Sequence, residues 1–425
     1  MATTPSAGEK TFFLNDIPPF TSLGGMPLSP EREEVIMRAR DMVPALRERR
    51  LETKALRRLP DATAEELRAN GLLNLRLPRE HGGIEIDNQT YAAVIAELAR
   101  GCGSTAWTVG IINDVWFLGG TVLPPEGREE FFASGLPGTA PFYPRKVAKG
   151  RKVEGGVRIE AGGEWPWASG SQLAGWVMPR VDLFNENDEF VDTLAPLIPM
   201  EDCEILDEWH MLAMGGSASN VIRIKDEVFV PDHRVGYMSR VLTNSHITDV
   251  PDFMRQPWLT GVIYGLAPIS VGLGRAALEI YLERAAGRPI ASTTYLDKSA
   301  AVRTHLIAAE AAQKIDAADL LLHRGCARLD MWAATGEDVS VADRTKTRAD
   351  LGYAGKLAQE AVNMLMMDAG ASALDDASPL STIAADSLAM PMHAAFNVTT
   401  TLENYGAVLN GHMPPAMALG DHVFV

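Results

Sequence analysis

Apolar residues recur at helical spacing along the first 137 residues of the chain. Between residues 35 and 46 they lie three and four positions apart, directly after Ser29 and Pro30, which suit the cap and first turn of a helix. The stretch 90–100 repeats this pattern, and Thr63 to Glu66 has the spacing of a capping box that opens a short helix. We therefore expect a helical N-terminal domain over residues 1–137.

In the middle of the chain the apolar residues alternate instead. Val157 and Ile159 alternate with polar residues after Gly155-Gly156, which suits a hairpin turn, and residues 221–230 alternate again. Several short strands separated by turns predict a small β domain, either a sandwich or a barrel, over residues 138–240.

Helical spacing returns in the last part of the chain. Residues 354–365 carry one apolar stripe, whereas the alanine-rich run 306–322 is apolar on more than one face. Such helices usually pack in a bundle, and surplus apolar surface often marks a subunit contact. The expected fold is therefore mainly α with a central β domain, and a helical bundle occupies residues 241–425.

Composition and charge narrow the range of partners. The 425 residues are 46% hydrophobic and 22% charged, which is ordinary for a globular protein. With 39 basic and 55 acidic side chains the net charge is −16, so nucleic acid and anionic membranes are poor partners. We recognise neither a run of roughly 18 apolar residues nor a signal peptide. The protein is therefore expected to be soluble and cytoplasmic.

The sequence carries no metal or disulfide motif. Its three cysteines, Cys102, Cys203 and Cys326, lie far apart without a CxxC pair, and its nine histidines lack the spacing of metal ligands. We expect reduced cysteines and no metal site.

Two segments and one histidine are candidates for binding a ligand. Residues 163–170 (GEWPWASG) place two tryptophans beside Ser169, so a planar ring could lie against a flat wall and receive hydrogen bonds at its edge. Gly215 to Asn220 combines small residues and hydroxyls that permit close approach of a polar ligand. On the residues alone, each feature also has a simple structural explanation. Segment 163–170 fits a core strand and 215–220 fits a plain turn. The histidine, His393, fits a buried and hydrogen-bonded core residue.

Taken together, the segments resemble a known family, the two-component, reduced-flavin-dependent monooxygenases related to the oxygenase component of 4-hydroxyphenylacetate hydroxylase. The resemblance spans about residues 30 to 410. It is carried by residues 77–83 (LPREHGG), 97–107 (ELARGCGSTAW), 163–170, 207–210 (DEWH), 216–219 (GSAS), 370–373 (GASA), Asp386 and His393. It implies the acyl-CoA dehydrogenase fold, with an N-terminal helical domain, a middle β-barrel or sandwich and a C-terminal four-helix bundle.

The resemblance also implies a cofactor and partners. A separate flavin reductase would supply reduced FMN or FAD, oxygen would form a flavin hydroperoxide, and the subunits would assemble as a homotetramer. Ser169 matches the residue that hydrogen-bonds flavin N5. Trp167 and Ser217 would wall the flavin pocket, and Arg288 would reach the flavin across a subunit boundary.

For the substrate, the resemblance assigns His393 as the catalytic histidine that orients or deprotonates a hydroxyl or amine. The family's histidine on the N-terminal helix is absent, because Asn113 and Asp114 stand there, followed by Trp116. We predict that these three side chains and His393 contact the substrate. The family's arginine before Asp386 is Ala385, and Met392 precedes His393 where an arginine is often found, so the substrate pocket is expected to differ from that of simple phenol hydroxylases.

The main prediction is hydroxylation of a small aromatic or phenolic substrate, and three alternatives stay open. The altered pocket leaves room for N-oxygenation of an amine such as an amino sugar. An acyl-CoA dehydrogenase is less well matched, because His393-Ala394-Ala395 stands where its carboxylate base is expected. A scaffold without enzymatic activity would explain the helical bundle but not the tryptophan–serine segment.

Overall fold

The computed structural model describes residues 29–242, 246, 249–414, 417–419 and 422–424. Its first part is helical, as the spacing of apolar residues predicts. The helices are α2 Pro30–Asp41, α3 Val43–Glu48, α4 Arg50–Leu56, α5 Asp61–Ala69, α6 Asn88–Gly101, α7 Gly103–Val122 and α8 Pro125–Ser134.

Local side-chain chemistry sets where these helices begin. The Ser29 hydroxyl accepts the Arg32 N–H at 3.4 Å and Pro30 opens α2, as expected. The capping-box prediction for α5 was wrong, because this helix already begins at Asp61. Instead, the Arg49 guanidinium donates to Thr63 Oγ1 at 3.3 Å and to Glu66 at 2.8 Å. The pair therefore ties α5 to the junction of α3 and α4.

Short strands fill the middle of the chain. They are β1 Gly138–Thr139, β2 Lys149–Val153, β3 Gly156–Ile159, β4 Glu164–Ala168, β5 Trp176–Val177, β6 Val181–Phe184, β7 Phe190–Pro196, β8 Ile198–Pro199, β9 Cys203–Leu206, β10 Asn220–Ile224, β11 Val228–Pro231 and β12 Val235–Tyr237. A six-stranded sheet has the order β11-β3-β2-β6-β7-β12, and two three-stranded sheets have the orders β4-β10-β9 and β1-β5-β8.

The run 221–230 is not one strand, contrary to its continuous alternation. It breaks between β10 and β11, because β10 pairs with β4 and β9 whereas β11 pairs with β3 in another sheet. Val157 and Ile159 point into a separate apolar core formed by these sheets, where both are fully buried.

The last part of the chain is again helical. Its elements are α9 Met238–Leu242, α10 Trp258–Ile263, α11 Pro268–Ala285, α12 Val302–Thr335, α13 Val341–Ala369, α14 Pro379–Ser387, α15 Ala389–Met392, α16 Val398–Leu409 and the short strands β13 Met417–Leu419 and β14 His422–Phe424. Helices α11, α12 and α13 pack on one another, and α6 packs against α11. One apolar core therefore joins the N-terminal and C-terminal helices.

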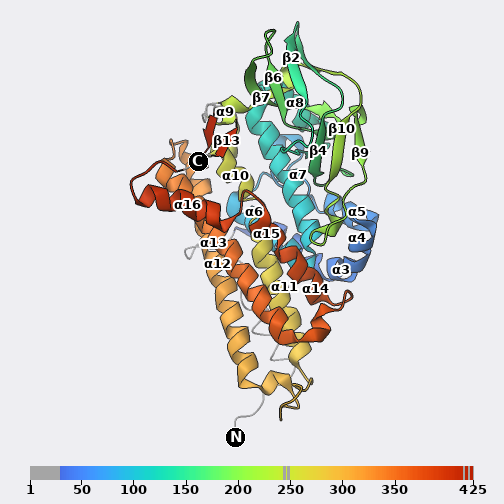
Figure 1. Cartoon of the computed structure of the whole chain (residues 1–425), viewed down its shortest axis with the longest axis vertical. Helices are drawn as coiled ribbons and strands as arrows, with labels where there is room; N and C mark the ends of the chain where they lie inside the picture. The colour runs from blue at the N-terminus through green and yellow to red at the C-terminus, as the bar shows by residue number, and fades with distance from the viewer. Residues whose placement is uncertain (1–28, 243–245, 247–248, 415–416, 420–421, 425) are drawn as a thin grey trace.

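Figure 1 shows the β strands at one end of the long axis, the bundle helices α11 to α13 towards the other, and α7 running between them. The segment Trp258–Ala285 is long and apolar enough to cross a membrane, so our expectation that no such segment exists was wrong. Its apolar window is 89% buried inside the protein, which is typical of a core helix.

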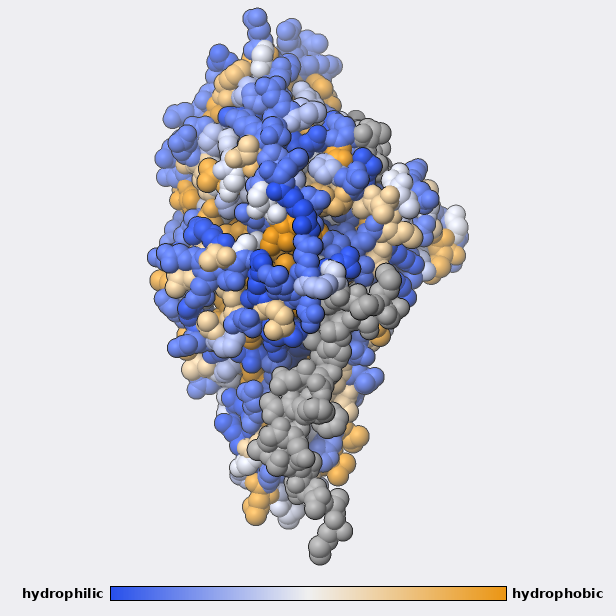
Figure 2. Space-filling view, turned by 180° about the vertical axis from the view of Figure 1, so that it is seen from behind, coloured by the Kyte–Doolittle hydropathy of each residue, from blue (hydrophilic) through white to orange (hydrophobic). Residues whose placement is uncertain are grey.

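Apolar side chains are also exposed on the outside of the bundle. Val302, Leu306, Leu320 and Met331 of α12 are each more than half exposed. The face seen from behind is mainly hydrophilic, with scattered apolar side chains and one apolar patch near its middle (Figure 2). Within the run 306–322, Leu306 and Leu320 are exposed whereas Ile315 and Leu322 are buried, so the prediction that this run is apolar on more than one face is confirmed.

The α6–α11 contact gives a test of this packing. A Cβ atom on Gly272 of α11 would lie 2.2 Å from the Ala96 carbonyl oxygen of α6. We expect Gly272→Ala to lower the free energy of unfolding by about 1–3 kcal/mol, because the helices must move apart. Urea denaturation measures this.

The matched control is Gly355→Ala within α13, where an added Cβ meets nothing within 4 Å. Alanine should stabilise that helix by about 0.5–1 kcal/mol. Equal effects of the two substitutions would contradict the packing argument.

Candidate active site

Helix α7 is the element around which the candidate site is built. It contacts β1 and β12 of the β region, α10, α11 and α14 of the bundle, and the turn at residues 215–217. Every α7 residue is buried except Ile111, which is only partly buried. A helix that is apolar all round and buried on all sides holds its side chains in fixed positions.

Ser169 lies in a tight turn directly after β4. The Ser169 N–H donates to the Trp167 carbonyl at 2.9 Å, and the Thr139 hydroxyl donates to the Ser169 carbonyl at 2.8 Å. Trp167 has a left-handed backbone with φ 62° and is 56% exposed as a residue, whereas Trp165 is fully buried. A strained aromatic residue left exposed beside a buried hydroxyl is typical of a ligand site.

Ser169 belongs to a line of four hydrogen-bonded polar side chains. The Trp107 indole N–H donates to Ser169 Oγ at 2.9 Å, and Ser169 Oγ lies 2.7 Å from Ser219 Oγ. Ser219 Oγ is in turn 2.7 Å from Ser217 Oγ. The result is a row of three serine hydroxyls that begins at an indole N–H, and we call it the serine row (Ser169, Ser219 and Ser217).

The loop that carries Ser217 and Ser219 is held from two sides. The Met214 N–H donates to Asp386 Oδ1 of α14 at 2.6 Å, and the Gly216 N–H donates to Ser104 Oγ of α7 at 3.1 Å. Met214 and Ala218 both have left-handed backbones, with φ of 52° and 48°. Burial raises the pKa of Asp386 to about 7, although Lys54 and Arg50 act in the opposite direction.

His393 approaches the same indole from the C-terminal helices. Its ring centroid lies 5.8 Å from that of Trp107 in an edge-on arrangement and 4.9 Å from that of Phe396. The Ala395 N–H donates to His393 Nδ1 at 3.2 Å, so the neutral imidazole carries its proton on Nε2. Burial lowers the pKa of His393 to about 4, so the ring is neutral at neutral pH.

The predicted substrate contacts Asn113, Asp114 and Trp116 belong to a different cluster. The Asn113 amide donates to the carbonyls of Leu72 and Val109 at 2.9 Å, and the Trp116 indole donates to the Leu73 carbonyl at 3.0 Å. All three side chains are buried.

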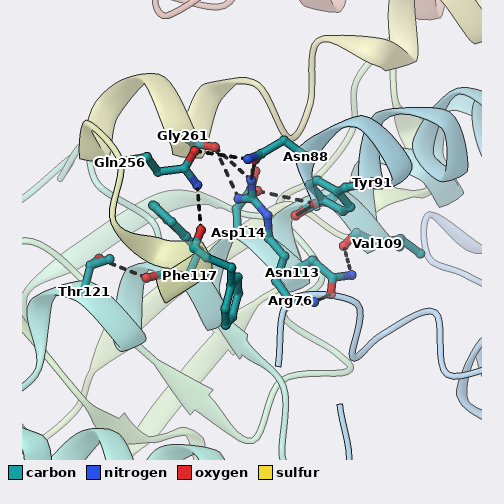
Figure 3. Close-up of polar contacts among 12 residues, drawn as sticks. Arg76, Asn88, Tyr91, Val109, Asn113, Asp114, Phe117, Thr121, Gln256 and Gly261 are labelled. Carbon is teal, nitrogen blue, oxygen red and sulfur yellow. Dashed lines mark hydrogen bonds and ion pairs between the residues drawn. The ribbon is translucent and has the colours of Figure 1, made fainter. Parts of the chain in front are cut away.

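Asp114 pairs with a buried arginine (Figure 3). Arg76 Nη1 lies 3.0 Å from Asp114 Oδ1, and the same guanidinium donates to Asn88 and to the Gly261 carbonyl. Burial raises the pKa of Asp114 to about 8 against the effect of Arg76. These side chains therefore connect α7 to the 72–76 loop and to α10. Their contact with the substrate stays a prediction.

Arg288 also lies apart from the serine row. It is exposed in the loop after α11, where its carbonyl accepts the Lys298 N–H at 2.6 Å. In the part of the chain that the structure describes, its guanidinium forms no hydrogen bond or ion pair. A contact with flavin across a subunit boundary stays a prediction.

Comparison with known proteins agrees with this geometry. Residues 29–123 match the acyl-CoA dehydrogenase N-terminal domain family, and residues 264–398 match the acyl-CoA dehydrogenase C-terminal domain family. A flavin-dependent monooxygenase oxygenase subunit of Rhodococcus jostii, HsaA, is 30% identical over 376 residues, which cover 86% of this chain and 95% of that protein. The chain belongs to the oxygenase subunits of flavin-dependent monooxygenases.

Two further relatives of the oxygenase support this assignment. The oxygenase component of an FADH2-dependent resorcinol hydroxylase from Rhizobium is 28% identical and covers 81% of this chain and 86% of that protein. The structure of Streptomyces XiaF in complex with FADH2 and glycerol superposes with a TM-score of 0.86 at 27% identity and covers 91% of this chain and 98% of that chain. The predicted family and fold are confirmed, and the relatives favour a monooxygenase over an acyl-CoA dehydrogenase.

The oxygenase site fits a flavin ring in its chemistry. An isoalloxazine is flat and apolar on its faces and has hydrogen-bonding atoms along one edge. The exposed Trp167 ring offers a face, and the Ser169 hydroxyl offers a partner for the edge. Among the described residues no group of three His, Cys, Asp or Glu side chains is placed to hold a metal ion.

Sequence reasoning missed Ser219 and Trp107 as members of the site. Ser219 lies between Ser169 and Ser217, so Ser217, which we predicted to wall the cofactor pocket, is fully buried behind it. The signal in the sequence is the small, hydroxyl-rich segment 215–220 itself, although the left-handed backbone of Ala218 that brings Ser217 and Ser219 into contact is not readable from it. No local signal marked Trp107, whose role depends on α7 meeting β4.

The low pKa of His393 predicts a pH-dependent contribution to stability. An unfolded histidine has a pKa of about 6.5, so between pH 6.5 and 4 the unfolded chain binds a proton that the folded chain does not. Stability from this group is therefore present above pH 6.5 and is lost as the pH falls towards 4. Between pH 7.5 and 4.5 the loss should be about 2 kcal/mol.

Urea denaturation of the parent protein and of His393→Gln at both pH values measures this loss. Glutamine does not titrate, so the variant should lose about 2 kcal/mol less than the parent over the same interval. An identical loss in both proteins would show that His393 titrates normally.

Proposed function

We propose that the oxygenase uses reduced FMN or FAD and dioxygen to hydroxylate a small aromatic or phenolic substrate. The relatives of the chain support this, since they include the oxygenase component of a resorcinol hydroxylase and that of a p-hydroxyphenylacetate hydroxylase. XiaF, a structural relative, holds FADH2.

One observation carries the proposal. Ser169 and His393, far apart in the sequence, both contact the Trp107 side chain, one through its N–H and the other through its ring. A cofactor bound at Ser169 and a substrate bound at His393 would therefore lie next to each other, as the transfer of an oxygen atom requires.

Each residue has a separate task in this proposal. Reduced flavin, when bound, would supply two electrons to dioxygen, so that one oxygen atom enters the substrate and the other leaves as water. Trp167 would pack against the flavin ring, and the Ser169 hydroxyl would hydrogen-bond at N5. Trp107 and Phe396 are apolar and buried and keep water out of the space beside His393.

His393 orients the substrate by donating a hydrogen bond from Nε2. Its Nδ1 already accepts the Ala395 N–H, and its low pKa keeps the ring neutral. A neutral ring with Nε2–H donates to a phenolic or hydroxyl oxygen, so it positions the substrate without first removing its proton.

The proposal also covers a partner protein, the oligomeric state and the location. A separate flavin reductase supplies the reduced cofactor, as in two-component systems. The exposed apolar residues Val302, Leu306 and Leu320 of α12 support burial between subunits, hence a homotetramer in which Arg288 approaches a neighbouring flavin. Sedimentation of the purified protein tests the tetramer, and we propose the cytoplasm as its location.

Single-turnover experiments test the function. The purified protein is mixed anaerobically with photoreduced FMN or FAD, then aerated with a phenol, an indole or an amino sugar, and both product and hydrogen peroxide are quantified. Oxygenated aromatic product supports the proposal. Oxygenation of only the amino sugar would favour the N-oxygenase alternative, and peroxide alone with every compound would contradict oxygen transfer.

Ser169→Ala should still bind flavin, although more weakly, and should release more peroxide for each product molecule. Losing one hydrogen bond of ordinary strength predicts a rise of about twofold to tenfold. Ser171→Ala is the matched control, because Ser171 is also buried in the same turn and its hydroxyl donates to the Ala218 carbonyl at 2.8 Å rather than to the serine row. An equal ratio of peroxide to product in the two variants would show that Ser169 has no role in the mechanism.

A further inference from the structure

The serine row contains more hydroxyl protons than its internal contacts use. Three hydroxyls carry three protons, and the two oxygen–oxygen contacts, each 2.7 Å long, use one proton each. The Trp107 indole can only donate, so it takes none of them. One proton is therefore left over.

The direction of this proton follows from the hydrogen bonding of Ser217, at the buried end of the serine row. Ser217 is 0% exposed, and in the described part of the chain its hydroxyl contacts only Ser219. Its proton must lie in that contact, because a buried donor without an acceptor is strongly disfavoured. Ser169 and Ser219, each 4% exposed, share the remaining proton at the open end.

Two arrangements satisfy these conditions. In the first, Ser219 donates to Ser169, both acceptor positions of Ser169 are filled, and Ser169 donates into the pocket. In the second, Ser169 donates to Ser219, Ser219 donates into the pocket, and Ser169 keeps an acceptor position facing the pocket. In both arrangements two of the three hydroxyl protons are paired within the row, and the third points towards a ligand bound beside Ser169.

We propose that Ser219 is a positioning residue that lets Ser169 serve both redox forms of the flavin. This inference rests on the proposed function. Flavin N5 accepts a hydrogen bond when the ring is oxidised and carries a proton, which it donates, when the ring is reduced. Reversal of the Ser169–Ser219 contact matches Ser169 to either form without moving a heavy atom.

Loss of the Ser219 hydroxyl should therefore affect the two forms unequally. In Ser219→Ala, Ser169 has no internal acceptor for its proton. Accepting a hydrogen bond from the flavin would leave that proton unpaired, so Ser169 favours donating into the pocket. Oxidised flavin keeps its hydrogen bond, whereas the N5 proton of reduced flavin faces an opposing donor. We expect reduced flavin to bind about twofold to tenfold more weakly and oxidised flavin to bind with nearly unchanged affinity.

Equilibrium binding measures this without turnover. FAD is titrated in air by fluorescence, and photoreduced FAD is titrated anaerobically by absorbance, against the full-length parent, Ser219→Ala, Ser169→Ala and Ser171→Ala. Ser169→Ala should weaken both forms, and Ser171→Ala neither. Ser219→Cys, with a similar volume and a weakly hydrogen-bonding thiol, repeats the test should alanine prevent folding.

The outcomes separate this inference from the proposed function. A parent protein that binds neither form of the flavin contradicts the function itself. A parent that binds both forms, with a Ser219 variant that loses affinity for both equally or for neither, overturns the role of Ser219 and leaves the function intact. Selective loss of the reduced form supports the inference.

Discussion

The hydrogen bond from the Trp107 indole to the Ser169 hydroxyl is the contact on which the site depends. It joins the central helix α7 to the turn after β4, two elements from different parts of the fold. Because the indole only donates, it fixes Ser169 Oγ as an acceptor on that side and leaves the rest of the hydroxyl for Ser219 and a ligand. His393 lies edge-on to the same ring, so one side chain sets the distance between the two halves of the site.

Strain and polar anchors keep this arrangement in place. Three residues other than glycine, Trp167, Met214 and Ala218, have left-handed backbones around the serine row. Such conformations are disfavoured for L-residues and persist only where the surroundings fix them. Here the Asp386 and Ser104 side chains bind the 214–216 backbone, and the Thr139 hydroxyl binds the Ser169 carbonyl. The site is thus formed before any ligand arrives, and binding requires little reorganisation.

The sequence predicted the helices and the family well because those signals are local. Apolar spacing located α2 and α6, and the GEWPWASG segment identified the turn that holds Ser169. The sequence did not predict the register of the strands or the direction in which side chains point. The run 221–230 alternates without interruption, yet its two halves join different sheets through long-range pairing. Asn113 and Asp114 were predicted as substrate contacts because they replace an expected histidine. In the structure a buried arginine pairs with Asp114, and a backbone carbonyl accepts a hydrogen bond from Asn113. Only the folded chain brings these partners near.

The single incompletely buried position on α7 has a consequence for changing the enzyme's selectivity. Ile111 lies one helical turn after Trp107, and its side chain is partly exposed while it packs against the main apolar core. Elsewhere on this helix a change of side-chain volume would disturb either the core or the Arg76 cluster. Efforts to redirect the catalyst towards bulkier or slimmer molecules are therefore best concentrated on Ile111, where shape can vary while the scaffold stays intact.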